Sequence, residues 1–329
     1  MAENTKENWI GFDLGGTKML AAVLNEKAKV LGRHRKKTKG HEGWEEGLGR
    51  MVATIRKAVE ESEIDPNTIG GIGVGCAGPI DLDKGVIFEA PNLGWEKVPV
   101  KKTLEEELGW PVEVVNDVDA GVFGEYSFGA ANGARCVVGI FPGTGIGGGC
   151  VYEGQIIRGK VGSCMEIGHI QVIPEGIASG HSLSGSLEAV ASRLAISAQA
   201  AQAAYRGAAP NLRKIAGTDI SDIRSGALAD SIKAGDKVIE QIVCAAADKI
   251  GVAVATIVHL LAPDIVVLGG GLVEAMPELI VEEVQKSAKR RVLPSFSKTY
   301  SVVAAKLGDD ATVMGAAAWA RSRLSNPEK

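Results

Sequence analysis

The sequence of 329 residues lacks an excess of positive charge, paired cysteines and a long apolar run. Its formal net charge of −4 argues against a nucleic-acid partner, because such a surface needs a basic stripe. The five cysteines form no CxxC pair, which favours free thiols in a reducing cytoplasm. The longest uncharged apolar run, 250–263, is too short to cross a bilayer, and residues 1–8 do not resemble a signal peptide. We therefore expect a cytoplasmic protein with no membrane partner.

The composition is that of a globular protein, with 45% hydrophobic and 23% charged residues. A chain of this length favours two domains, each able to bury a core. We predict an N-terminal α/β domain of residues 1–126 plus 310–329, and a C-terminal α/β domain of residues 127–309.

Residues 9–32 have the pattern of an apolar strand, a tight turn and a second strand. We expect the two glycines of the turn to allow a bend that a Cβ would forbid and to expose N–H groups to a ligand. The threonine and lysine suit an anion, and the aspartate suits a phosphate that carries magnesium, held through water. A plain glycine hairpin with solvated side chains is an equally weighted alternative. The turn residues are Asp13, Gly15, Gly16, Thr17 and Lys18.

The same pattern returns at residues 136–159, and a third glycine turn follows the apolar strand 265–268. Two similar hairpins, one opening each half of the chain, suggest a duplicated architecture with a cleft between the halves. Three glycine turns after apolar strands indicate a nucleotide held from both sides. The residues of the second and third turns are Gly143, Thr144, Gly145, Gly269, Gly270 and Gly271.

Elsewhere the chain alternates predicted helices and strands, which indicates an α/β fold with partly antiparallel sheets. We predict loops at residues 78–81 and 91–95. Further strands are predicted at 72–75, 112–115 and 300–304, and helices at 40–64, 120–128, 187–205, 237–261, 277–289 and after 310.

Two stretches match the patterns of nucleotide-binding motifs, but the residues that follow them do not fit those motifs. Residues 143–148 match GxGxxG, but the sequence continues as a strand where a dinucleotide fold needs a helix. Residues 154–160 match GxxxxGK, but Val161 replaces the hydroxyl residue that would hold magnesium. No GxSxG motif supports a serine hydrolase.

Asn116 and Asp117 lie where a predicted strand gives way to a helix, a usual place for ligand groups. A carboxylate there can accept a proton from a hydroxyl that attacks phosphorus. On spacing alone, the alternative that Asp117 is only the N-cap of the helix is favoured.

A second polar cluster contains Glu166 and His169, and Glu188 follows it. Acidic side chains and a neutral imidazole can hydrogen-bond a polyol ring without a metal. His169 has two other interpretations, a satisfied core histidine or a zinc ligand.

Taken together, four motifs resemble the ROK family of bacterial sugar kinases and repressors, and its glucokinases most. They are Asp13 to Lys18, Asn116-Asp117, Glu166-x-Gly168-His169 and Asp264-x-x-x-x-Gly269-Gly270-Gly271. The resemblance extends from Ile10 to Ala317 and implies the two-domain actin-like ATPase (ribonuclease H-like) fold, with ATP and sugar meeting in an interdomain cleft.

The resemblance also implies a role for each matching residue. Asp117 would be the catalytic base, the turns at 13–18 and 143–145 would hold phosphates and magnesium, and Gly269 to Gly271 would lie under the adenosine. Gly78 belongs to a stretch that resembles the glycine loop beside the sugar. The sugar would be bound by Asn92, Asn116, Asp117, Glu166, His169 and Glu188.

The chain departs from the family at a zinc cluster, where CxCGxxGCxE is common. Here the three cysteine positions hold Ser179, His181 and Ser186. Serine hydroxyls are poor zinc ligands, and His169 with His181 supplies only two good ones. We predict no structural zinc.

The sequence therefore predicts an ATP-dependent hexose kinase that converts glucose to its 6-phosphate, with Mg²⁺ as cofactor. N-acetylmannosamine, N-acetylglucosamine and fructose stay open as substrates, and polyphosphate stays open as donor. A sugar-sensing regulator is disfavoured, because nine residues before Ile10 leave no room for a helix-turn-helix domain. The resemblance implies a homodimer or a larger homo-oligomer.

Overall fold

The computed structural model describes residues 6–159, 162–176, 178, 180 and 183–325. It divides into two compact units. Unit 1 consists of Met1–Gly133, Gly154–Cys164 and Asp309–Lys329, and unit 2 of Ala134–Glu153 and Met165–Gly308. The domain boundaries at 126/127 and 309/310 stay a prediction.

Unit 1 is built on a sheet with the strand order β3-β2-β1-β4-β8. β1 and β2 form the predicted antiparallel hairpin, β3 extends it, and β4 and β8 are parallel to β1. The strands are β1 (Asn8–Leu14), β2 (Lys18–Asn25), β3 (Val30–Lys37), β4 (Ile69–Cys76) and β8 (Val112–Asn116).

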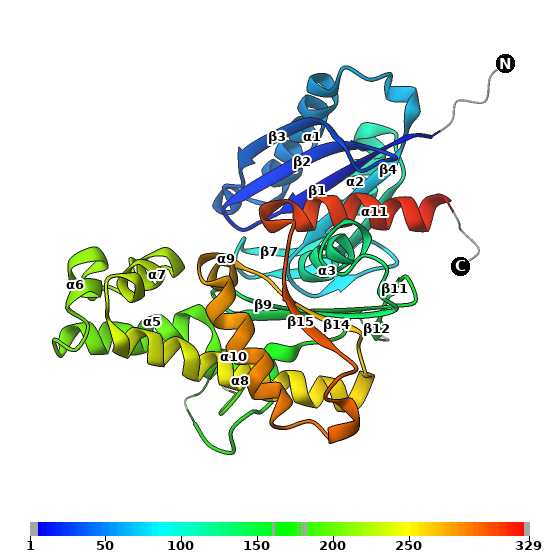
Figure 1. Cartoon of the computed structure of the whole chain (residues 1–329). Helices are drawn as coiled ribbons and strands as arrows, with labels where there is room; N and C mark the ends of the chain where they lie inside the picture. Colours follow the sequence, from blue (N-terminus) through cyan, green and yellow to red (C-terminus); the bar gives the residue numbers. More distant parts are fainter. Residues whose placement is uncertain (1–5, 160–161, 177, 179, 181–182, 326–329) are drawn as a thin grey trace. The chain divides into compact units, whose positions relative to one another are not determined.

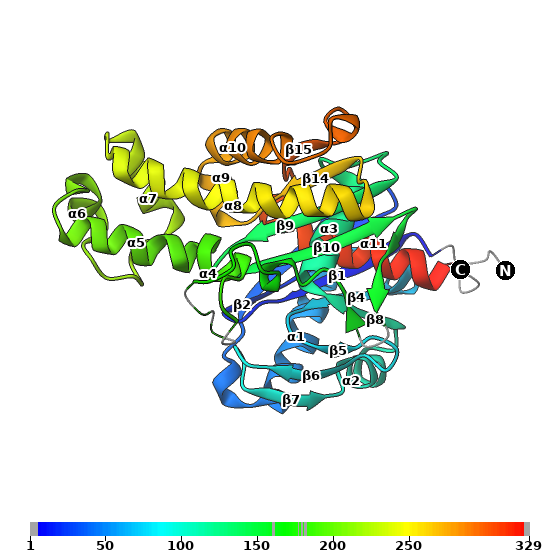
Figure 2. The same ribbon diagram turned by 90° about the horizontal axis from the view of Figure 1, so that it is seen from below.

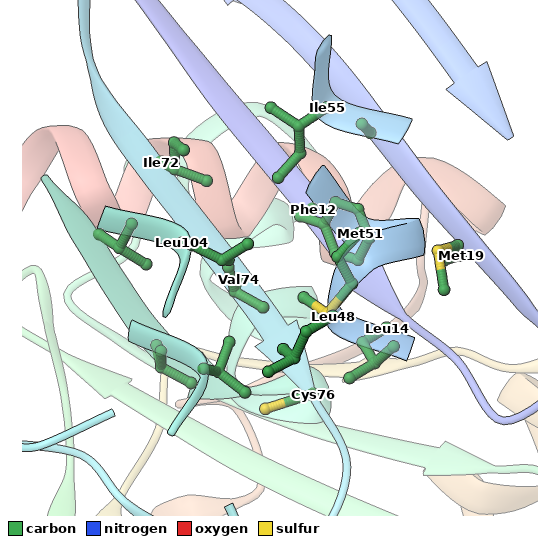
Figure 3. Packing of buried hydrophobic residues seen from close by; sticks show 14 of the residues in the cluster. Phe12, Leu14, Met19, Leu48, Met51, Ile55, Ile72, Val74, Cys76 and Leu104 are labelled. Carbon is green, nitrogen blue, oxygen red and sulfur yellow. The ribbon is translucent and has the colours of Figure 1, made fainter. Parts of the chain in front are cut away.

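Both faces of this sheet are covered by helices, as the alternation of side chains along β1 requires. Phe12 and Leu14 pack with Met51 of α1 on one face (Figure 3). Trp9 packs with Val313 of α11 on the other face. The helices of unit 1 are α1 (Trp44–Ser62), α2 (Val100–Leu108), α3 (Asp117–Phe128) and α11 (Ala311–Ser325), with short 3₁₀ turns at Gly40–Glu42, Pro66–Thr68 and Gly308–Asp310.

The helices α3 and α11 lie side by side in Figure 1, although almost 200 residues separate them in the sequence. Glycines make this approach possible. A Cβ on Gly315 would overlap the carbonyl oxygen of Ala120, and one on Gly124 would overlap that of Ala311. The close seam joins the last helix to the body of unit 1.

The loop prediction is confirmed at residues 78–79 and 91–94, which are bends, turns or irregular, and was wrong at Ile80, Asp81 and Trp95, which belong to strands. They contribute to a small sheet with the order β5-β6-β7, formed by Ile80–Asp81, Val86–Ala90 and Trp95–Val98. Strands of two to five residues are too short for an alternating pattern to stand out. Three further two-residue strands of unit 1 are β11 (Gln155–Ile156), β12 (Arg158–Gly159) and β13 (Gly162–Ser163). Of the rejected GxxxxGK motif, Lys160 and the following Val161 lie outside the described residues.

Unit 2 repeats the plan of unit 1. Its strands lie in the order β10-β9-β14-β15, with an antiparallel hairpin β9–β10 and two strands parallel to β9. This is the same order and direction as β2-β1-β4-β8, so the predicted duplicated core is confirmed. The bounds are β9 (Cys136–Pro142), β10 (Ile146–Tyr152), β14 (Ile265–Leu268) and β15 (Ser301–Ala304).

Helices make up most of the rest of unit 2, where α8 and α10 pack against each other (Figure 2). The single helix predicted over 187–205 is two helices, because the Ser192 side chain accepts a hydrogen bond from Ala195 N (3.2 Å) and caps a new one. The helices are α4 (Leu187–Ala191), α5 (Arg193–Tyr205), α6 (Pro210–Ala216), α7 (Ser225–Lys233), α8 (Lys237–Leu261), α9 (Gly271–Ala275) and α10 (Pro277–Lys289), with 3₁₀ turns at Ile167–His169 and Pro294–Phe296.

α8 is long and apolar enough to cross a membrane, judged by length and composition alone. In the part of the chain that the structure describes, it is the one such helix, and 56% of its most apolar window is buried in the protein. Core helices of this kind pass the same test, so α8 is weak evidence for a membrane span.

Candidate active site

The glycine turn of unit 1 is tied to the end of β3. Gly15 N donates to Lys18 O (3.1 Å) across the turn. Thr38 holds both arms, because its hydroxyl donates to Gly15 O (2.7 Å) and its N–H to Thr17 O (2.9 Å). The buried Thr38 was not predicted from the sequence, since it follows a third strand that the hairpin pattern does not include.

The two glycines of this turn are needed to different degrees, and neither has a positive φ. A Cβ on Gly15 would lie 2.7 Å from Lys18 O, which is too close. A Cβ on Gly16 would lie 3.5 Å from the Cβ of Asn92, an ordinary contact. The expectation that both positions exclude a Cβ was therefore wrong for Gly16. The same contact places Asn92 beside the turn.

Asp13, near the end of β1, and Asp117, directly after β8, interact electrostatically. Burial, and then the charges of Asp117 and Asp309, raise the pKa of Asp13 to about 7, while Arg35 lowers it. A buried carboxyl group with another carboxylate beside it favours a bound proton or a bound cation. The chemistry of Asp13 therefore fits a carboxylate that would hold magnesium through water.

Asn116, and not Asp117, is the N-cap of α3. The Asn116 Oδ1 accepts hydrogen bonds from Val118 N (2.9 Å) and Asp119 N (3.2 Å). The alternative interpretation of Asp117 as N-cap is therefore wrong. Asp117 is the first helical residue, and its Oδ1 accepts a hydrogen bond from Val118 N (3.0 Å).

Gly78 follows β4 with φ 99°, a left-handed conformation that favours glycine. A Cβ at this position would also overlap Glu89 O of β6. Gly78 therefore fixes the loop after β4 against the small sheet, whose β6 leads directly to Asn92.

The glycine turn of unit 2 is held by two helices. Gly143 N donates to Gly145 O (2.8 Å). Arg193, at the start of α5, donates from Nη2 to the Thr144 hydroxyl (2.8 Å) and from its N–H to Gly143 O (2.9 Å). Glu188 of α4 accepts from Ile146 N (3.0 Å) through Oε2. Arg193 was not predicted, because no motif marks an arginine that lies 49 residues beyond its partner.

Glu188, predicted to bind sugar, thus lies at the turn predicted to bind phosphate. A Cβ on Gly145 would overlap the Glu188 Oε2. A pocket of about 380 Å³ opens beside both Thr144 and Glu188 and continues along α5 to Gln202.

Glu166 and His169 flank the 3₁₀ turn Ile167–His169. Their side chains approach to 3.9 Å between Oε2 and Nε2, with Glu166 exposed and His169 half-buried. A Cβ on Gly168 would overlap Ile146 O, so this turn lies against the first residue of β10. The structure therefore brings Glu166, His169 and Glu188 to the same end of the β9–β10 hairpin.

The third glycine turn connects β14 to α9. Gly269 N donates to Ile140 O of β9 (3.1 Å), and a Cβ there would overlap the ring of Phe141. Gly270 has φ 79° and precedes α9. The turn lies along the end of β9 that leads to Gly143.

Within residues 6–159, 162–176, 178, 180 and 183–325, no group of three histidine, cysteine or acidic side chains could hold a metal ion. Ser179 and His181 of the altered zinc motif lie outside these residues. Ser186 accepts from Ala189 N (3.3 Å) and caps α4. The absence of zinc stays a prediction. All five cysteines are free, as predicted.

A family model described as "ROK family" matches residues 9–323. The glucokinase of Thermotoga maritima is 34% identical over 96% of this chain and 98% of its own. A ROK family glucokinase from Streptomyces griseus, solved with glucose and AMPPNP, is 31% identical with a TM-score of 0.81, over 96% of this chain and 99% of its own. A ROK hexokinase from Thermus thermophilus is 32% identical with a TM-score of 0.83, over 97% and 99%.

Proposed function

The chain belongs to the ROK family, and from this premise we propose that it is an ATP-dependent glucokinase that makes glucose 6-phosphate. The full-length likeness to glucokinases of the same actin-like fold supports both the reaction class and ATP as donor. The observation that supports the proposal most is the position of Asp117, which begins α3 at the end of β8 and interacts electrostatically with Asp13.

Asp117 is the general base in this proposal. Its carboxylate accepts the proton of the sugar's 6-hydroxyl as that oxygen attacks the γ-phosphorus in line. Asn116 keeps the helix end in place, so the carboxylate does not have to cap α3 itself. Most of the remaining rate enhancement comes from positioning the two substrates.

Asp13 would hold a magnesium ion through its water ligands. When bound, the ion neutralises charge on the phosphates of the donor. Because burial and Asp117 keep the pKa of Asp13 near 7, the Asp13 carboxyl group would lose its proton readily and serve as the anionic partner of the cation.

The glycine turns bind the nucleotide through exposed N–H groups. Residues 15–18 and 143–145 hold the phosphates, and 269–271 lie under the adenosine. Arg193 adds a cation to the second turn, since its guanidinium already donates to the Thr144 hydroxyl. The sugar is bound by Asn92, Asn116, Glu166, His169 and Glu188. For Glu188 this leaves Oε1 to meet the sugar while Oε2 accepts from Ile146 N.

The test is a panel of hexoses assayed by ADP release with the wild type and with Asp117→Ala. Glucose should be the best of glucose, fructose, N-acetylmannosamine and N-acetylglucosamine. Asp117→Ala should lower kcat by about 10²–10⁴-fold, the usual contribution of a general base. Turnover near that of the wild type would contradict the assignment of the base. The same preparation, examined by light scattering, tests the proposed homodimer or larger assembly.

A further inference from the structure

Two lysines lie directly opposite each other beside the glycine turn of unit 1. In the register of β2 and β3, Lys18 pairs with Lys37. Opposed residues of an antiparallel pair have Cα atoms roughly 4.5–5.5 Å apart, and like charges at such positions are destabilising. Both side chains are exposed, and neither takes part in an ion pair or side-chain hydrogen bond with any of the described residues.

The other cations on this face of β3 do have partners. Side chains alternate along a strand, so Arg33 and Arg35 share the face of Lys37. Arg33 contacts Asp310 (2.7 Å) and Arg35 contacts Asp309 (3.6 Å). Pairing therefore neutralises the arginines and leaves the lysine pair as a concentration of positive charge at the turn.

Thr38 anchors the end of β3, which carries Lys37, to the glycine turn. It follows Lys37 directly, and its two hydrogen bonds join β3 to Gly15 and Thr17. The backbone of Lys37 is thus held beside the turn, although it lies 22 residues beyond Gly15 in the sequence.

We propose that Lys18 and Lys37 together bind the phosphate chain of the phosphoryl donor, which makes Lys37 a second donor-binding cation. This inference rests on the proposed kinase function. Two ammonium groups offer six N–H donors, and a linear phosphate chain carries several charged oxygens that can accept from both. Binding would also relieve the repulsion within the pair. The shared chemistry fits either a nucleoside triphosphate or inorganic polyphosphate.

The edge position of β3 supplies a competing explanation, since lysines on edge strands prevent pairing with other chains. Lys36 provides a matched control for it. It is exposed and adjacent to Lys37, but it pairs with Met19, which is buried on the opposite face of the sheet. Edge protection would make Lys36 and Lys37 equivalent, whereas donor binding would not.

The experiment compares Lys37→Gln with Lys36→Gln at saturating glucose. Lys37→Gln should raise the KM for ATP about tenfold, as expected for one lost charge-assisted hydrogen bond, and leave the KM for glucose unchanged. Lys36→Gln should leave both within about twofold. Raising KCl from about 50 to about 300 mM should weaken ATP binding more in the wild type than in Lys37→Gln, because salt screens the lost contact. Equal effects of the two substitutions would overturn the proposal.

Two further arms separate the possible outcomes. The KM of Lys37→Gln is also measured with polyphosphate as donor. A higher KM for polyphosphate alone would identify the inorganic chain as the ligand, and a higher KM for ATP alone would identify the nucleotide. Equilibrium binding of AMPPNP or polyphosphate, measured by calorimetry, does not need turnover. If no hexose is phosphorylated, the proposed function fails, while calorimetry still decides whether Lys37 binds phosphate.

Discussion

The two glycine turns have the same backbone plan but obtain their charges in different ways. In unit 1 the charges belong to the strands: Asp13 is the second-last residue of β1, and Lys18 begins β2 opposite Lys37. In unit 2 residues 142–146 carry no charge, and Arg193 and Glu188 reach the turn from α5 and α4. A repeated scaffold therefore fixes the position of the main-chain N–H groups and leaves the chemistry of each half to be set separately.

Substitution of Asp13 should show how much the negative charge at the first turn lowers the free energy of unfolding. The unfolded chain loses this proton near pH 3.8 and the folded protein near pH 7. Stability should therefore fall as the pH rises from about 4 to about 7, by about 1.4 kcal/mol per unit and roughly 4 kcal/mol in all. Asp13→Asn should remove this dependence and make the apo protein more stable at pH 8, at the expense of activity.

Urea unfolding of both proteins at pH 5 and pH 8 measures this effect. Asp222→Asn is the control, because Asp222 is exposed, is not among the groups that shift the pKa of Asp13, and should have a small effect on stability. If the free energy of unfolding changed equally with pH in the wild type and in Asp13→Asn, the charge of Asp13 would not destabilise the protein.

Alanine at Gly145 and at Gly16 should show how differently the two turns constrain these two positions. At Gly145 the new Cβ would overlap Glu188 Oε2, and moving that carboxylate breaks its bond to Ile146 N. We expect Gly145→Ala to cost about 1–3 kcal/mol, typical of overpacking. Gly16→Ala, with its nearest contact at 3.5 Å, should change stability by about 0.5 kcal/mol or less. Thermal unfolding of the two variants side by side decides this, and similar losses would remove the contrast.

The smallest effect is expected from substitution of Arg193. If the second turn depends on α5 for its cation, Arg193→Gln should raise the KM for ATP about fivefold to tenfold, with little effect on the melting temperature. Arg206, which ends the same helix and is exposed, provides the control in Arg206→Gln. An unchanged KM for ATP in Arg193→Gln would leave the second turn without a functional cation.

The sequence predicted the elements whose apolar pattern is long and regular. Both hairpins, β14, α8 and α10 are found where they were expected. The break at Ser192 was missed, because an alanine-rich stretch carries no glycine or proline to mark it. The strands β5 to β7 were missed because each is too short to show a period.

The candidate site was predictable only where a motif is continuous in the sequence. The three turns and the pair Asn116-Asp117 could be identified in this way, although which of the pair caps α3 depends on side-chain geometry. Thr38, Lys37 and Arg193 could not, because each reaches a turn from a different element. Contacts between distant parts of the chain set these positions, and a single sequence does not record them.

The glycine seam between α3 and α11 can form only at the end of synthesis, because α11 is made last. Every strand of the large sheet in unit 1 leaves the ribosome before residue 117, yet one face of that sheet is covered by residues 311–325. During synthesis at ordinary rates of about 5–20 residues per second, that apolar face is exposed for roughly ten seconds or more. Trp9 and its neighbours therefore stay exposed in the nascent chain until residues 311–325 have been made.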